Sequence, residues 1–198
     1  MRTPLHKSSW RYADAPSLAA MGAEEWATLS RQRSDFFAEY QARAALKMLQ
    51  STADEPSFGY QINIFRHGLQ TATLLQQAGY DEETVVVALL HDIGFTAAPI
   101  THGRVAAAML GPYISEEHHW MLEHHQVFQD YTVVHLPAEE RNARERWRGH
   151  KAFAWTCEFV DKYDQLSLRA DVDTLPLAYF EPMVQRFFRK KPRPQPTE

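Results

Sequence analysis

Histidine and aspartate residues between positions 67 and 161 are the side chains of this sequence with the clearest capacity for chemistry. His91 and Asp92 stand side by side at the end of the apolar run 85–90. Because desolvating an ion costs several kcal/mol, an imidazole and a carboxylate in such a setting need a compensating partner. A metal ion could hold both, and the Asp92 carboxylate could bridge two ions while His91 binds one.

Further ligands are available elsewhere in the chain. Imidazole and carboxylate together suit iron, manganese, zinc and other first-row divalent ions. These further positions are His67, His102, the adjacent pair His124 and His125, and Asp161. Each has an ordinary interpretation when taken alone. A lone histidine in an apolar helix is more often a hydrogen-bonded core residue, and Asp161 could pair with Lys162. The recurrence of the two residue types is what predicts a metal site.

The hydrophobic pattern predicts helices joined by short loops, with one or two ligands on each of five helices. The expected helices span about 24–49, 62–78, 81–94, 101–110, 115–129, a stretch from Pro137, 150–168 and 176–190. The run Val85-Val86-Val87 could be a strand, but its length and capped surroundings favour a helix. Thr101 and Ser115 are expected N-caps.

These elements predict an all-α, single-domain helical bundle whose ligands converge in the core. Residues 1–22 are expected to be irregular, 23–188 to form the helical core, and 189–198 to be a frayed basic, proline-rich tail. The 198 residues, 44% apolar content and net charge of −4 are typical of a soluble globular protein. One cysteine, no signal peptide and no membrane span favour the cytoplasm, and neither a nucleic acid nor a membrane is expected as a partner.

The order His67, His91-Asp92, Asp161 resembles the H…HD…D pattern of the HD-domain superfamily, over roughly residues 57–188. These helical metalloproteins include many phosphohydrolases. Adding His102 and His125 gives a six-ligand set similar to the mixed-valent di-iron oxygenases of the myo-inositol oxygenase and 2-amino-1-hydroxyethylphosphonate dioxygenase type. That resemblance implies two iron ions, Fe(II)/Fe(III), bridged by Asp92, with a small hydroxylated substrate and O2.

The chain departs from the phosphonate enzymes near the expected substrate. A tyrosine, Tyr60, is present but shifted, Phe95 stands where they have a histidine, and Gln129 and Glu158 stand where they have cations. Without those cations a phosphonate dianion loses its charge-assisted contacts. The runs His119 to Gln129 and 148–150 are similar to those of uncharacterised bacterial HD-domain proteins.

Several further residues are expected near the site. His124 and His125 point about 100° apart on a helix, so one of them is expected to be the ligand, and the resemblance favours His125. Residues that could support the ligands are His118, His119, His124 and His150. Residues that could contact the substrate are Tyr60, Arg104, Gln129, Arg148, Lys162 and Asp164.

Two functions of different classes follow from these residues. The first is a di-iron oxygenase that oxidatively cleaves a small hydroxylated substrate. The alternative is a phosphohydrolase that acts on a nucleotide or other phosphate ester with Mn, Co, Zn or Mg, because bound divalent ions lower the pKa of water. A metal-binding regulatory module is a third possibility.

Overall fold

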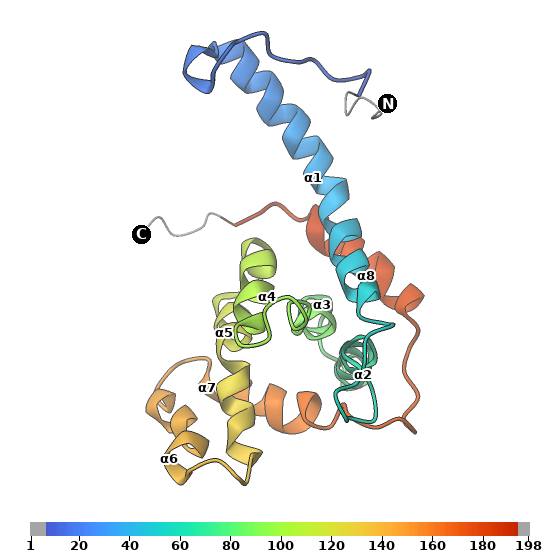
Figure 1. Cartoon of the computed structure of the whole chain (residues 1–198), viewed down its shortest axis with the longest axis vertical. Coiled ribbons are helices and arrows are strands. Elements are labelled where there is room, and N and C mark those ends of the chain that lie inside the picture. The colour runs from blue at the N-terminus through green and yellow to red at the C-terminus, as the bar shows by residue number, and fades with distance from the viewer. Residues whose placement is uncertain (1–6, 194–198) are drawn as a thin grey trace.

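The structure is a computed structural model that describes residues 7–193, and helices are the regular elements throughout that range (Figure 1). This confirms the predicted all-α, single-domain fold. The α-helices are α1 (Ala23–Ser51), α2 (Ile64–Gln77), α3 (Glu82–Leu90), α4 (His102–Leu110), α5 (Glu116–Gln129), α6 (Ala138–Arg141), α7 (Phe153–Phe159) and α8 (Leu177–Arg189). Short 3-10 turns cover Leu18–Ala20, Gly111–Tyr113, Asp130–Thr132 and Ala143–Trp147, and a π turn covers Val160–Asp164.

Both predicted N-cap residues occupy their expected positions, but only one of the two makes a capping hydrogen bond. The Ser115 side chain accepts a hydrogen bond from the backbone N–H of His118 at 3.1 Å, as predicted for the start of α5. Asp81 accepts one from the backbone of Thr84 at 2.9 Å and so caps α3. Thr101 is the N-cap residue of α4, as predicted, but its side chain makes no capping hydrogen bond.

Helix α3 forms the centre of the bundle. Every side chain from Thr84 to Leu90 is buried, between α2 and α8. The run Val85–Val87 is therefore helical, as predicted, because it is enclosed by other helices rather than paired with strands. His91 and Asp92 follow directly after this helix, so its burial carries them into the interior.

The expected helix over 150–168 is divided into two parts. Helix α7 ends at Phe159, and the chain continues in a π turn closed by a 3.1 Å hydrogen bond from the Gln165 N–H to the Val160 carbonyl. A π turn inserts one extra residue per turn and rotates the side chains that follow. The prediction of one continuous helix was wrong, and the difference decides which aspartate enters the site.

The C-terminal end of the described chain lies against the bundle. The Arg193 N–H donates to the Pro112 carbonyl at 2.7 Å, so the predicted fraying is wrong for the tail up to this residue. Residues 194–198 of that tail, and 1–6 of the predicted irregular N-terminal segment, lie outside the described range. No described helix is both long and apolar enough to cross a membrane.

Candidate metal centre

Six buried histidine and aspartate side chains converge where α2, α3, α4, α5 and the π turn meet. They are His67 on α2, His91 and Asp92 just after α3, His102 at the start of α4, His125 late in α5, and Asp164 at the end of the π turn. Five of these six were predicted from the sequence. Residues separated by almost a hundred positions thus form one cluster in the core.

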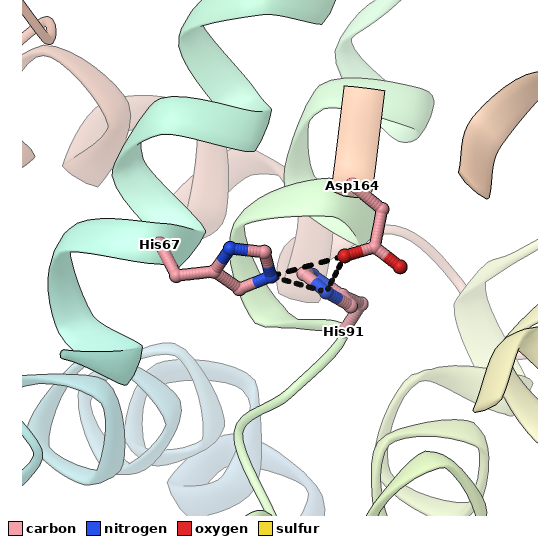
Figure 2. Close-up of side chains that lie close together, drawn as sticks. All are labelled: His67, His91 and Asp164. Atoms are coloured by element: carbon pink, nitrogen blue, oxygen red, sulfur yellow. Dashed lines mark hydrogen bonds and ion pairs between the residues drawn. The ribbon is translucent and has the colours of Figure 1, made fainter. Parts of the chain in front are cut away.

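The first group consists of His67, His91 and Asp164 (Figure 2). The Nε2 atoms of the two histidines lie 3.1 Å apart. Asp164 Oδ1 lies 3.1 Å from the Nε2 of His67 and 3.6 Å from that of His91. Two nitrogens and one oxygen therefore point at a common position, which is the arrangement of ligands around a small cation.

The second group consists of His102, His125 and one oxygen of Asp92. The two Nε2 atoms again lie 3.1 Å apart. Asp92 Oδ1 lies 3.1 Å from the Nε2 of His102 and 3.3 Å from that of His125. His91, Asp92 and His125 also form a close set of three potential ligands, so the two groups adjoin.

Asp92 links the two groups through its two carboxylate oxygens. While Oδ1 faces His102 and His125, Oδ2 lies 3.6 Å from the Nε2 of His67 and 3.5 Å from that of His91. A carboxylate with one oxygen toward each histidine pair is placed to bridge two cations, as the sequence predicted for this residue.

The four histidines share one orientation. In each, Nδ1 lies within 2.8 Å of a backbone carbonyl oxygen. His67 faces the carbonyl of Ser167, His91 that of Ala88, His102 that of Pro99, and His125 that of Leu122. A carbonyl can only accept, so Nδ1–H donates in every case. In the neutral ring this leaves Nε2 unprotonated, with its lone pair toward the cluster. Backbone carbonyls thus fix the tautomer that a metal requires.

The paired lone pairs explain why this site fits a metal ion. Two unprotonated Nε2 atoms 3.1 Å apart cannot hydrogen-bond to each other, and a carboxylate oxygen faces each pair. Such an arrangement is repulsive unless a proton or another cation lies between the groups. The nitrogen and oxygen donors suit first-row divalent metals. The residues could therefore hold metal ions.

The pKa values of these groups also indicate that the cluster favours positive charge. Burial alone would lower the pKa of His67, but the hydrogen bond to Asp164 and the charges of Asp164 and Asp92 outweigh it and raise that pKa to about 9. Burial would also lower the pKa of His102, but the hydrogen bond to Asp92 outweighs burial and raises that pKa. Burial would raise the pKa of both carboxyls, but the neighbouring histidines hold the pKa of Asp92 and of Asp164 well below the usual range. Positive charge is therefore favoured at His67 and His102, and a metal ion would replace it.

Two glycines next to ligand histidines allow the helices to come this close. A Cβ on Gly68 would lie 2.7 Å from the Leu89 carbonyl oxygen, so α2 can approach α3 only without a side chain there. A Cβ on Gly103 would collide with the Leu122 carbonyl and lie 3.0 Å from Cε1 of His125. These contacts set the spacing within the two histidine pairs.

Asp161 does not enter the cluster, and its prediction as a ligand is corrected to Asp164. The Asp161 side chain is 45% exposed and lies 3.4 Å from Nη1 of Arg144, whereas Asp164 is 1% exposed. The π turn at 160–164 directs Asp164 into the core. Asp164 was predicted as a substrate contact, so its position in the site was expected but its role was not.

Gln129, predicted as a substrate contact, hydrogen-bonds to one of the clustered carboxylates. Its Nε2 donates a 2.7 Å hydrogen bond to Oδ2 of Asp164, the oxygen that faces away from the histidines. This bond fixes the carboxylate so that Oδ1 stays on His67. The sequence offered no signal for the pairing, because the partners are 35 positions apart.

The four other histidines predicted near the site lie outside the cluster. His124 stacks on Trp120 with ring centroids 4.0 Å apart and hydrogen-bonds to its carbonyl, whereas His125 lies in the cluster. His150 stacks on the same indole at 4.3 Å. His118 lies 3.1 Å from Glu83 Oε1, and His119 pairs with Glu123. None of these four contacts a ligand side chain in the described chain, so they do not support the site directly.

The cluster opens into a pocket of about 360 Å³. His67, Asp92, His102 and Asp164 lie at its inner end. Its other lining residues include Phe58, Tyr60, Ile62, Asn63, Phe95, Gln126, Gln129, Asp130 and Thr132, and no described Lys or Arg lines it. The pocket therefore combines aromatic and uncharged polar groups with carboxylates.

The predicted substrate-binding cations lie elsewhere. Arg104 lines a separate shallow surface depression on α4. Arg148 pairs with Glu145, and Lys162 pairs with Glu158, with both cations exposed. Of the predicted substrate contacts, Tyr60, Gln129 and Asp164 line the pocket, and these three cations do not.

Compared with known proteins, the chain matches no family model and no curated protein sequence.

Proposed function

We propose that this chain is a dinuclear metalloenzyme of the HD-domain superfamily. The observation that carries the proposal is the pair of histidine groups, one on each oxygen of Asp92. His67, His91 and Asp164 would hold one ion and His102 and His125 the other, with Asp92 shared. Six protein ligands for two ions leave positions for exogenous ligands, which is a feature of catalytic rather than structural sites.

The reaction that this site supports best is oxidation of a small hydroxylated substrate by O2. Two iron ions bound here would supply the redox chemistry for activating O2 and cleaving the substrate oxidatively. His102 and His125 favour this reading, because they give a second complete binding position beyond the shorter H…HD…D pattern. The resemblance to the mixed-valent di-iron oxygenases rests on the same two residues.

The pocket lining disfavours a phosphate ester as substrate. Phosphoryl groups are bound by charge-assisted hydrogen bonds from Arg and Lys. The described lining has neither, and the Asp130 carboxylate adds negative charge. The hydroxyl groups of Tyr60 and Thr132 and the amide of Gln126 suit the hydroxyls of an uncharged substrate, while Phe58 and Phe95 cover the entrance with apolar surface.

The chain's own contribution is to hold the donors in place and to limit water around them. The Gln129 amide keeps Oδ2 of Asp164 occupied, so that Oδ1 remains directed at His67. Backbone carbonyls keep the proton of each ligand histidine on Nδ1. Such a preorganised site does not need to rearrange when substrate binds.

Turnover assays separate the two functions. The protein, loaded anaerobically with ferrous iron, is mixed with small uncharged polyols and other hydroxylated compounds while O2 uptake is recorded. We expect substrate-dependent O2 uptake and none from the His125→Ala variant. Hydrolysis of phosphate esters with manganese or cobalt, without O2 uptake on any hydroxylated compound, would establish the phosphohydrolase instead.

A further inference from the structure

Helix α1 extends well beyond the bundle. It has 29 residues, so it is about 43 Å long at 1.5 Å per residue. Its buried residues, Ala42, Ala45, Leu46 and Leu49, all lie in its last ten positions, where it packs on α8. The first half of the helix, drawn in blue, projects away from the other helices (Figure 1).

A row of large apolar side chains is exposed on this helix. Trp26 is 38% exposed, Phe37 43% and Tyr40 44%. At about 100° per residue, positions 26, 29, 33, 37 and 40 share one face, which we call the α1 stripe. It continues along the helix to Ala44 and Lys47, opposite the face that packs on the bundle.

The N-terminal segment covers a different side of α1. The Trp10 ring lies edge-on to Phe36, with centroids 5.9 Å apart, and the Arg11 backbone exchanges hydrogen bonds with the Gln32 side chain. Within residues 7–193, Trp26, Phe37 and Tyr40 of the stripe stay exposed, whereas Leu29 is half-buried beside residues 11–14. Most of the stability of a helix in a protein comes from tertiary packing of one face, so a covered stripe would stabilise the projecting half.

We propose that a second copy of this chain covers the stripe, through an antiparallel pair of α1 helices related by a twofold axis between Phe36 and Phe37. A closed twofold pairing lets one surface complement itself. In this pairing, residues whose numbers sum to 73 face each other. Arg33 then lies opposite the second copy's Tyr40, and Trp26 lies opposite its Lys47.

The charges and rings of the stripe match in this arrangement. Each basic side chain meets an aromatic ring, a cation–π pairing worth about 0.5–1 kcal/mol when exposed. Arg33 and Lys47 make no ion pair with any described residue, so both are free for the contact. A parallel pair would instead place Arg33 against Arg33 and Lys47 against Lys47, which is repulsive. The stripe is therefore self-complementary in one direction only.

Sedimentation analysis of the full chain tests the pairing independently of the metal centre. We expect the protein to sediment at about twice its 22.9 kDa mass at micromolar concentrations. Phe37→Glu should shift it to a monomer, because it places two carboxylates at the axis. Val134→Glu, at an exposed apolar residue remote from α1, is the matched control and should remain dimeric. A wild-type monomer, or a dimer that Phe37→Glu leaves intact, would overturn the proposal.

Cross-linking tests the direction of the helices. In a Cys157→Ser background, Phe37→Cys should be linked to its own counterpart by a short bis-maleimide, because the two positions face each other at the axis. Ala23→Cys should not be linked, because its counterpart would lie about 40 Å away along the helices. Equal cross-linking at both positions would indicate a parallel pair and contradict the proposal.

Discussion

At the residue scale, Asp92 is the side chain that makes one site out of two histidine pairs. Its two oxygens lie within 3.6 Å of the Nε2 atoms of all four ligand histidines. The carboxylate is also buried, which is costly unless positive charge is close. The other ligands each contact one histidine pair and should therefore affect one ion.

His102→Ala removes a ligand from the second group and leaves the first group complete. We expect this variant to lose about half of the bound metal, since His67, His91 and Asp164 would still hold one ion. Metal analysis of the purified variant measures the loss. Asp92→Ala is the comparison and should lose nearly all of the metal. Retention of two ions by His102→Ala would remove His102 from the ligand set.

Asp164→Ala and Asp161→Ala form a matched pair, three positions apart. Asp164→Ala should lose about half of the metal, because its Oδ1 faces the first histidine pair. Asp161→Ala should bind a full complement, because that side chain is exposed and pairs with Arg144. If metal analysis showed that Asp164→Ala keeps all of its metal while Asp161→Ala loses half, the position of the π turn would be contradicted.

Protonation of His67 predicts how metal binding depends on pH. Its pKa of about 9 in the metal-free chain means that the ring is protonated at neutral pH and must release a proton to bind metal. Affinity should rise about tenfold per pH unit between pH 6.5 and 9. In the metal-free chain the raised pKa stabilises the fold below about pH 6.5, and that contribution is lost as pH rises through 9.

Calorimetric titration in buffers of different ionisation enthalpy counts the protons released. About one proton per ion should be released at the His67 position at neutral pH. His67→Gln should reduce this number. Metal binding without proton release, at an affinity independent of pH, would show that His67 is neutral in the free protein.

At the scale of elements, the spacing between α4 and α5 sets the second histidine pair. Gly103 lies directly against the Leu122 carbonyl and the ring of His125. Any side chain there has to push the helices apart. The two helices carry His102 and His125, so separation would open their 3.1 Å contact.

Gly103→Ala should therefore destabilise the protein by about 1–3 kcal/mol and weaken binding of one metal ion. Gly149→Ala is the matched control, since no atom lies within 4 Å of the added Cβ and it should change neither property. Thermal unfolding with and without metal, together with metal analysis, measures both effects. Equal stability of the two variants would contradict the close approach of α4 and α5.

Helix boundaries were largely predictable from the sequence, whereas the last ligand was not. Apolar spacing and capping residues locate α1, α2, α4, α5 and α8 to within about two residues, whereas α3 ends four residues earlier than expected. Asp161 and Asp164 are three residues apart, and such positions share a helix face, so periodicity cannot separate them. A π turn decides between them, and regular helix periodicity does not predict where such a rare turn falls.

At the scale of the whole molecule, the bundle places ligands from distant segments around one buried point. The residue types and the HD dipeptide predicted the location of the site, because buried charges require partners. The pocket above it brings together segments near positions 58, 95, 130 and 165, which no local pattern relates. Its lack of cationic side chains could be recognised only after folding.

The central claim is that two coupled metal ions share Asp92, and metal counting with EPR tests it most directly. The protein is purified anaerobically with ferrous iron, partly oxidised, and measured for iron content and EPR signal. We predict about two iron ions per chain and a signal from a coupled mixed-valence pair. One iron per chain, or two irons with the signals of isolated ions, would contradict the bridged centre.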